Sequence, residues 1–158
     1  MLTIDVKNTE SMFGKMKEAE LAIGGYYKTC FEKDIPENKG FWKALSEAEF
    51  KHAGNMDKIF GLIKKNPNHY YYGLDFDPIN IKEIVDEAKA AALKVNNLQF
   101  MGKSMLLAAK GLEDRLLEKK YFESVKGEEL EFVEILNAMR EETRLHREML
   151  LKKIENAK

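Results

Sequence analysis

The sequence has very little cysteine, proline or tryptophan. Cys30 is the only cysteine, which excludes an intrachain disulfide and a metal site built from several thiolates. We expect it to be a small buried hydrophobic residue. Three prolines among 158 residues, together with few runs of alternating apolar and polar residues, favour an all-helical chain.

An excess of charge of one sign and a long hydrophobic run are also missing. The formal net charge is −1, from 26 basic and 27 acidic residues, so composition predicts neither a nucleic-acid partner nor an anionic membrane. No apolar run reaches the length of about 18 residues that spans a bilayer. The first residues lack the pattern of a secretion signal, and we therefore expect a cytoplasmic protein.

The length of the chain is enough for one domain with a substantial core, and we expect residues 1–158 to form it. Pro36 is placed to begin a helix, and an Asn-Pro-Asn run at 66–68 to end one. Helices are expected over residues 10–32, 36–65, 79–95, 98–124 and 128–156. Short turns pair the four longer helices, and a long connection, 66–97, separates the pairs. This predicts a four-helix bundle of two helical hairpins, with a long crossover that contains an extra helical segment.

The helix over 36–65 carries an apolar stripe that two polar side chains interrupt. Steps of three and four residues select Trp42, Leu45, Glu49, His52, Met56, Ile59 and Ile63. Such a stripe faces a core. Because burying an unpaired charge is costly, Glu49 and His52 need a reason to lie there, and a bound metal ion supplies one.

The other long helices repeat this feature. The stripe of the first is Phe13, Met16, Glu20, Ile23, Tyr27 and Phe31, and that of the helix over 98–124 is Leu106, Ala109, Glu113, Leu116 or Leu117, and Tyr121. The last stripe is Phe132, Ile135, Met139, Glu142, His146 and Met149. Each hairpin therefore has one acid on its first helix and an acid with a histidine on its second.

The spacing of these residues indicates an internal repeat. Twenty-nine residues separate Glu20 from Glu49, and the same number separates Glu113 from Glu142. Two such hairpins packed with approximate two-fold symmetry bring four carboxylates and two imidazoles together in the middle of the bundle. Carboxylate and imidazole ligands suit iron, manganese or zinc.

This arrangement resembles the ferritin-like di-iron carboxylate family, and most closely the di-iron domain of rubrerythrins. The family pattern is Glu, Glu-x-x-His, Glu and Glu-x-x-His on four successive helices. The last motif departs from it, because Thr143 stands three residues before His146. We expect Glu142 to take the missing role, since i and i+4 also share a helix face, with a local π-bulge as one way to achieve this.

The resemblance implies two iron ions, with manganese or zinc as alternatives, and no catalytic residues beyond the metal ligands. Glu49 and Glu142 would bridge the ions by analogy, and Glu20 and Glu113 would be terminal ligands. A site with one ion or none also fits the Thr143 departure. Tyr27 is expected to support the ligands from behind.

The implied activity is an oxidoreductase, peroxidase or iron-handling reaction on dioxygen or hydrogen peroxide. No Cys-x-x-Cys pair is present, so the electron donor would be a separate protein. The family also implies a homodimer, for which Gly24-Gly25 or the 66–97 connection could provide the surface. Within the first helix the same two glycines predict either close approach of a neighbouring helix or a kink. The alternative function is a non-catalytic helical bundle with a degraded metal site, acting as a binding or scaffold module.

Overall fold

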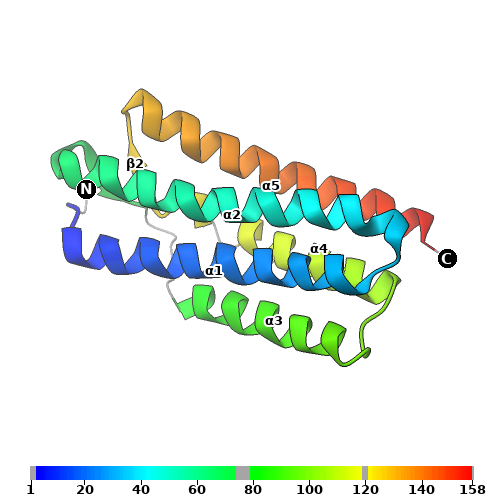
Figure 1. Cartoon of the computed structure of the whole chain (residues 1–158). Coiled ribbons are helices and arrows are strands. Elements are labelled where there is room, and N and C mark those ends of the chain that lie inside the picture. The colour runs from blue at the N-terminus through cyan, green and yellow to red at the C-terminus, as the bar shows by residue number, and fades with distance from the viewer. Residues whose placement is uncertain (1–2, 74–78, 119–120, 158) are drawn as a thin grey trace.

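The computed structural model describes residues 3–73, 79–118 and 121–157. Five α-helices account for most of them, which confirms the all-α prediction (Figure 1). Their bounds are α1 Val6–Lys33, α2 Pro36–Lys65, α3 Ile79–Asn96, α4 Lys103–Glu118 and α5 Leu130–Asn156. Two single-turn 3-10 helices, Pro67–His69 and Tyr121–Glu123, and two short strands, β1 Tyr70–Tyr72 and β2 Val125–Gly127, complete the described elements.

The helices form two antiparallel pairs that lie against each other. Figure 1 shows α1 and α2 as one pair and α4 and α5 as the other, while α3 runs alongside α1 and brings the chain back along the length of the bundle. The connection between the pairs therefore contains the helical segment that the sequence predicts. Among the described helices, none is long and apolar enough to cross a membrane.

The first hairpin matches its prediction closely because local signals define its ends. Asp5 begins α1 by accepting a hydrogen bond from the backbone N–H of Asn8 (3.0 Å), so the helix starts four residues earlier than expected. Pro36 occupies the first turn of α2. In the turn between them, the Asp34 carboxylate accepts a hydrogen bond from the indole N–H of Trp42 (2.7 Å). This bond ties the turn to the buried stripe of α2.

The second hairpin differs from its prediction. The expected helix over 98–124 is shorter than predicted: Leu98 and Gly102 adopt positive φ angles of 60° and 56° before α4 begins, and residues 121–123 form a 3-10 helix. Instead of the short turn expected between the last two helices, β2 pairs with β1 in an antiparallel ribbon that aligns Tyr70 with Gly127. The ring of Tyr70 packs edge-on against Phe132 (4.9 Å between centroids), which joins this ribbon to the start of α5.

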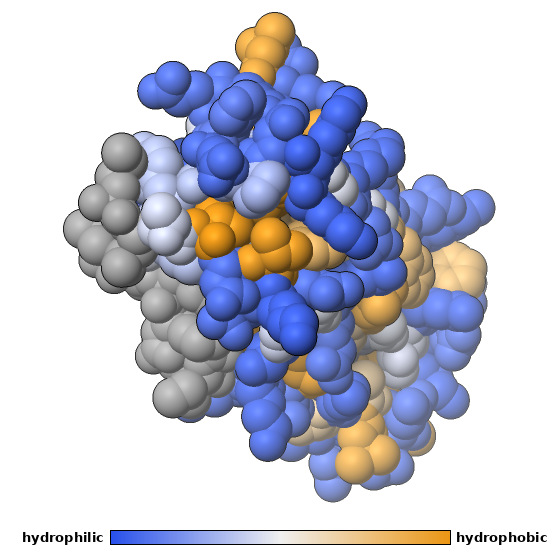
Figure 2. Space-filling view, turned by 90° about the vertical axis from the view of Figure 1, so that its left-hand side faces the viewer, coloured by the Kyte–Doolittle hydropathy of each residue, from blue (hydrophilic) through white to orange (hydrophobic). Residues whose placement is uncertain are grey.

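The apolar stripes of the helices form one core. All seven stripe residues of α2 are buried, and so are five of the six of α1. Cys30 is fully buried, as expected. On the end of the bundle that lies at the left of Figure 1, the surface is mostly hydrophilic around a small apolar patch (Figure 2). Most large apolar side chains are thus turned inward, where they surround the polar residues described next.

Phe132, Met139 and His146 of the predicted α5 stripe are buried, but at its other three positions the next residue along the chain is buried instead. Leu136, Thr143 and Leu150 are buried on this helix, where Ile135, Glu142 and Met149 were expected. The difference arises because two faces of one helix, one residue apart, both carry apolar residues, and contact with α4 and α2 selects between them. The side chain of Tyr121, the last member of the expected α4 stripe, lies outside the described residues.

Candidate metal centre

Five of the six predicted ligands converge inside the bundle. Glu20 comes from α1, Glu49 and His52 from α2, Glu113 from α4 and His146 from α5. The first four have no solvent exposure at all, and His146 is 8% exposed. Carboxylates and imidazoles are rarely buried unless they are paired or coordinate a metal, so this cluster requires a physical explanation.

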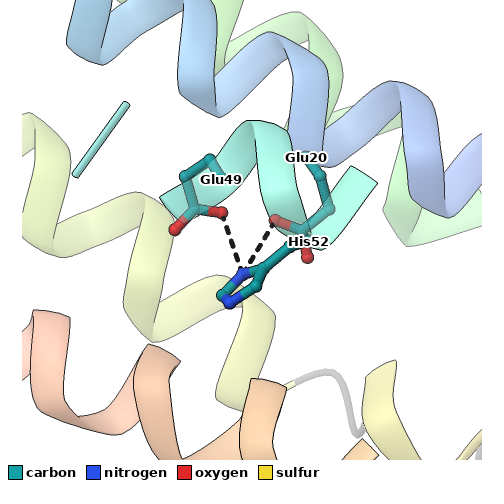
Figure 3. Close-up of side chains that lie close together, drawn as sticks. All are labelled: Glu20, Glu49 and His52. Carbon is teal, nitrogen blue, oxygen red and sulfur yellow. Dashed lines mark ion pairs between the residues drawn. The ribbon is translucent and has the colours of Figure 1, made fainter. Parts of the chain in front are cut away.

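Glu20, Glu49 and His52 form the first of two groups (Figure 3). The Nδ1 atom of His52 lies 3.8 Å from Oε2 of Glu20 and 3.6 Å from Oε2 of Glu49. Both carboxylates point toward the same ring nitrogen from different helices. Since each residue can offer one ligand atom within 4.8 Å of the others, the three are arranged around a common point.

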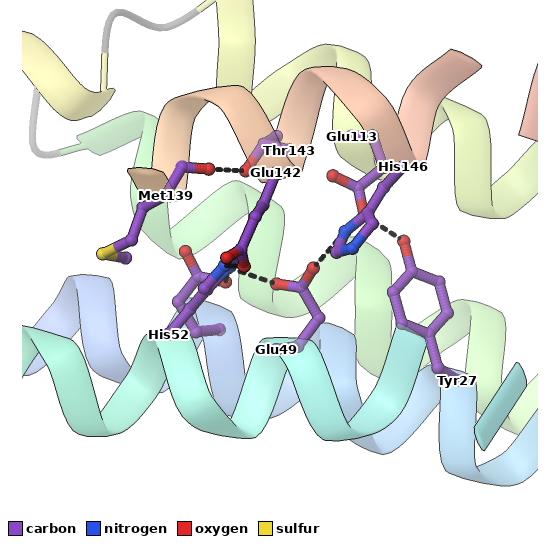
Figure 4. Close-up of polar contacts among 9 residues, drawn as sticks. Tyr27, Glu49, His52, Glu113, Met139, Glu142, Thr143 and His146 are labelled. Carbon is purple, nitrogen blue, oxygen red and sulfur yellow. Dashed lines mark hydrogen bonds and ion pairs between the residues drawn. The ribbon is translucent and has the colours of Figure 1, made fainter. Parts of the chain in front are cut away.

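Glu49, Glu113 and His146 form the second group (Figure 4). Here Nδ1 of His146 lies 3.1 Å from Oε1 of Glu49 and 3.7 Å from Oε1 of Glu113. Glu49 therefore directs one oxygen to each group. The rings of His52 and His146 are stacked, with centroids 6.1 Å apart and an interplanar angle of 24°. The two groups are neighbours that share a single carboxylate.

Several polar atoms of these groups have no hydrogen-bond partner. Among the described residues, the buried atoms without a partner include both carboxylate oxygens of Glu20, Oε2 of Glu49, Nδ1 of His52 and Oε2 of Glu113. An unsatisfied buried polar atom costs about 1–3 kcal/mol, and more when it is charged. Buried oxygens and an imidazole nitrogen that face a shared point fit the ligand preferences of iron, manganese or zinc, and the donor set therefore suits a bound cation.

Glu142, the sixth predicted ligand, lies elsewhere. Its side chain is 38% exposed, and its Oε2 atom is 2.7 Å from Nε2 of His52, on the side of the ring away from Nδ1. The position facing the interior is taken by Thr143, which is fully buried and donates a hydrogen bond to the carbonyl of Met139 (2.9 Å). α5 is continuous α-helix through this region, without the π-bulge considered above.

The correction has a simple geometric reason. On a regular helix the residues three and four positions before His146 both lie near its face, and the packing of α5 turns Thr143 inward and leaves Glu142 at the edge. On α2 the inward acid, Glu49, stands three residues before His52. The same spacing applied to His146 would have identified Thr143 as the inward residue of α5. Glu142 reaches the cluster from the edge and contacts the outer nitrogen of His52 instead of the shared point.

Tyr27 contacts the second group through Glu113. It is fully buried on α1, and its hydroxyl donates a 2.5 Å hydrogen bond to Oε1 of Glu113. Its ring packs against Trp42, with centroids 5.9 Å apart. The hydroxyl of this packed ring therefore already occupies one oxygen of Glu113. His69, the remaining histidine, is surface-exposed and pairs with Glu129 (2.9 Å).

The cluster shifts the pKa values of its members in opposite directions. Burial, reinforced by the charge of Glu49, raises the pKa of Glu20 well above its ordinary value and that of Glu113 to about 7. Burial alone would also raise the pKa of Glu49, but the Glu20 carboxyl and the two imidazoles hold it below its ordinary value. Glu49 is therefore the group that most readily keeps its negative charge.

The two histidines keep their protons in this environment. Burial alone would lower the pKa of His52, but its contacts with Glu20 and Glu49 raise it to about 11. In the same way, Glu113 and Glu49 raise the pKa of His146 to about 9 against the effect of burial. In the absence of a cation, protons on the imidazoles balance the charge of the carboxylates, and a metal ion would have to displace them.

A scan of protein-family models finds no match to this chain, and searches of curated proteins and of solved structures find none either.

Proposed function

We propose that this protein is a di-metal carboxylate protein of the ferritin-like type, with iron as the first candidate metal. Two antiparallel helix pairs joined by a long crossover support this type of bundle. The observation that carries the proposal is the set of buried oxygen and nitrogen atoms without hydrogen-bond partners, from α1, α2 and α4, that face two adjacent points. A group built only to stabilise the fold would join these atoms by hydrogen bonds.

The residues have distinct roles in this proposal. Glu49 would bridge two ions, since it directs one oxygen to each group. Glu20 and His52 would complete one ligand set, and Glu113 and His146 the other. Glu142 accepts a hydrogen bond from the outer nitrogen of His52 and so would orient that ring. Glu142 is not placed to bridge the ions as Glu49 is.

Bound iron would supply redox chemistry with dioxygen or hydrogen peroxide, as an oxidoreductase, a peroxidase or an iron-handling protein. The residues of this chain would position the ligands and exclude water from the site. Leu45 and Met56, one turn to either side of Glu49 and His52 on α2, are 1% exposed and keep water from the cluster. Tyr27 donates a hydrogen bond to one oxygen of Glu113. The electron donor in this proposal is a separate protein.

The test is the metal content of the protein. Metal-free protein is dialysed to equilibrium against a saturating concentration of iron(II) without oxygen, and the bound iron per chain is measured against the dialysis buffer. We expect two ions in the wild type and loss of stoichiometric binding in Glu49→Ala. Glu47→Ala is the matched control, since Glu47 lies on the same helix with its side chain 68% exposed, and it should bind as the wild type does. Unchanged binding in Glu49→Ala would show that the assignment is wrong.

The second candidate function is a bundle without a metal, serving as a binding or scaffold module. The burial of Thr143 where two-fold symmetry would place a fourth carboxylate favours it, because the site then has fewer anionic ligands. The same measurement separates the two, since this candidate requires that the wild type holds no stoichiometric iron, manganese or zinc.

A further inference from the structure

We propose that the two ligand groups are unequal: the Glu20–Glu49–His52 group binds the first divalent ion tightly, and the Glu49–Glu113–His146 group binds a second ion weakly and exchangeably. This inference rests on the proposed function, since it assigns an order to the two ions. The two groups differ in three ways: in the number of ligand atoms without a hydrogen-bond partner, in the hydrogen bonds that compete with an ion, and in the hydrogen bonds to the outer nitrogens of the histidines.

The first difference is in the atoms that are free to bind. In the Glu20 group, both oxygens of Glu20, Oε2 of Glu49 and Nδ1 of His52 have no hydrogen-bond partner among the described residues. In the other group only Oε2 of Glu113 is unpartnered and buried. An ion entering the first group gains ligands that were costly to leave unsatisfied, while an ion entering the second must first break existing bonds.

The second difference is the set of bonds that compete with the ion. Tyr27 donates its hydroxyl to Oε1 of Glu113 at 2.5 Å, a short charge-assisted geometry. Nδ1 of His146 lies 3.1 Å from Oε1 of Glu49 and forms a hydrogen bond with it. The corresponding atoms of His52 and Glu49 are 3.6 Å apart, which is beyond hydrogen-bond distance. Both competing bonds thus fall in the second group.

The third difference is the support behind each histidine. Nε2 of His52 bonds to the Glu142 carboxylate at 2.7 Å, which fixes the ring with Nδ1 toward the cluster and makes it a better ligand. Among the described residues, no side chain forms a corresponding bond to Nε2 of His146. The His146 side chain is 10% exposed, whereas that of His52 has no exposure. Water therefore reaches the second group first, and the ion held there should exchange more readily.

Cobalt(II) titration of the metal-free protein tests this order. Cobalt(II) accepts the same oxygen and nitrogen ligands, and its visible absorption and calorimetric heat report each ion separately. We expect two phases whose dissociation constants differ by about tenfold to a hundredfold, the range that supporting contacts of this kind produce. Glu20→Gln should remove the tight phase, while Glu113→Gln should remove only the weak one.

Tyr27→Phe gives the sharpest readout, because deletion of a hydroxyl should improve binding. Freeing Oε1 of Glu113 should tighten the weak phase about threefold to tenfold, the equivalent of one hydrogen bond, and leave the tight phase unchanged. Tyr26→Phe is the matched control. Tyr26 is the adjacent buried tyrosine on α1, but its hydroxyl bonds to the carbonyl of Met105 (2.7 Å), so neither phase should change.

The outcomes separate the inference from the proposed function. Two ions of equal affinity, or loss of the tight phase in Glu113→Gln, would overturn the inference while leaving a di-metal protein in place. Weaker binding of the second ion in Tyr27→Phe would also count against it, provided that circular dichroism shows an unchanged fold. No cobalt binding by the wild type would refute the proposed function, and the inference with it.

Discussion

Raising the pH of the metal-free protein from about 7 to about 9 should lower its free energy of unfolding steeply. A group whose pKa is higher in the folded chain stabilises the fold at low pH, and this contribution is lost as the pH rises through the folded-state pKa. His52 and His146 have folded-state pKa values of about 11 and about 9. In the unfolded chain both titrate near their ordinary value of about 6.5.

The expected slope follows from counting protons near pH 8. There the folded chain keeps a proton on nearly every His52 and on most His146 side chains, whereas the unfolded chain keeps almost none. A difference of about two protons corresponds to a loss of about 2–3 kcal/mol per pH unit. The raised pKa of Glu20 acts in the same direction. Glu49, whose pKa is lowered, is ionised in both states in this range and adds no slope.

Urea unfolding of chelator-treated protein, followed by circular dichroism at closely spaced pH values, measures this slope. A total stability of about 5–15 kcal/mol is typical of a single domain, so the loss should bring the midpoint down visibly within two pH units. His146→Gln should remove about half of the slope, and His69→Gln, on a histidine whose side chain is 61% exposed, should leave it intact. A stability that is constant or rises between pH 7 and 9 would refute the reasoning.

Two further predictions concern metal loading and helix contact. Binding of cobalt(II) at pH 7 should release protons from the two imidazoles, and the calorimetric heat of binding should therefore depend on the ionisation heat of the buffer. A heat that is the same in all buffers would contradict this proton release. A free cobalt(II) concentration one hundred times the dissociation constant should raise the free energy of unfolding by about 3 kcal/mol. Gly25→Ala should stabilise the protein by up to about 1 kcal/mol in urea unfolding, because its new Cβ meets nothing within 4 Å. Gly24→Ala should gain less or destabilise, because its Cβ would lie 2.9 Å from the Phe50 ring and 3.3 Å from Cβ of Glu49; an equal gain in both variants would contradict the close approach.

The glycine pair shows how the structure decides between alternatives that the sequence left open. Gly24 permits close approach of α2, as the Cβ distances show, and its carbonyl accepts a hydrogen bond from Ser46 (2.9 Å). Gly25, one residue later, faces open space. α1 continues as one helix through both residues, so the glycines do not mark a kink. Close approach of α2 accounts for Gly24, and it does not account for Gly25.

The candidate site was predictable where the stripe of a helix was unambiguous. On α2, large apolar residues flank Glu49 and His52 on both sides, and every member of the predicted stripe is buried. Glu20 and Glu113 have similar flanks and are also buried. On α5 the apolar residues permit two faces one position apart, and the sequence alone did not identify Thr143 as the inward residue. The β1–β2 ribbon was missed because three-residue strands are too short to produce a periodic pattern.

By itself, the sequence determined that this chain is helical and that Glu20, Glu49, His52 and Glu113 lie on apolar stripes, because hydrophobic periodicity is a local property of each helix. The tertiary structure decided how far each helix extends and which face of α5 is buried. It also decided which atoms meet. Glu49 is the carboxylate that both ligand groups share, and Tyr27 bonds to Glu113 in the second group. These depend on the packing of residues 86 to 97 positions apart along the chain, such as Glu49 against His146, and no local pattern specifies such contacts.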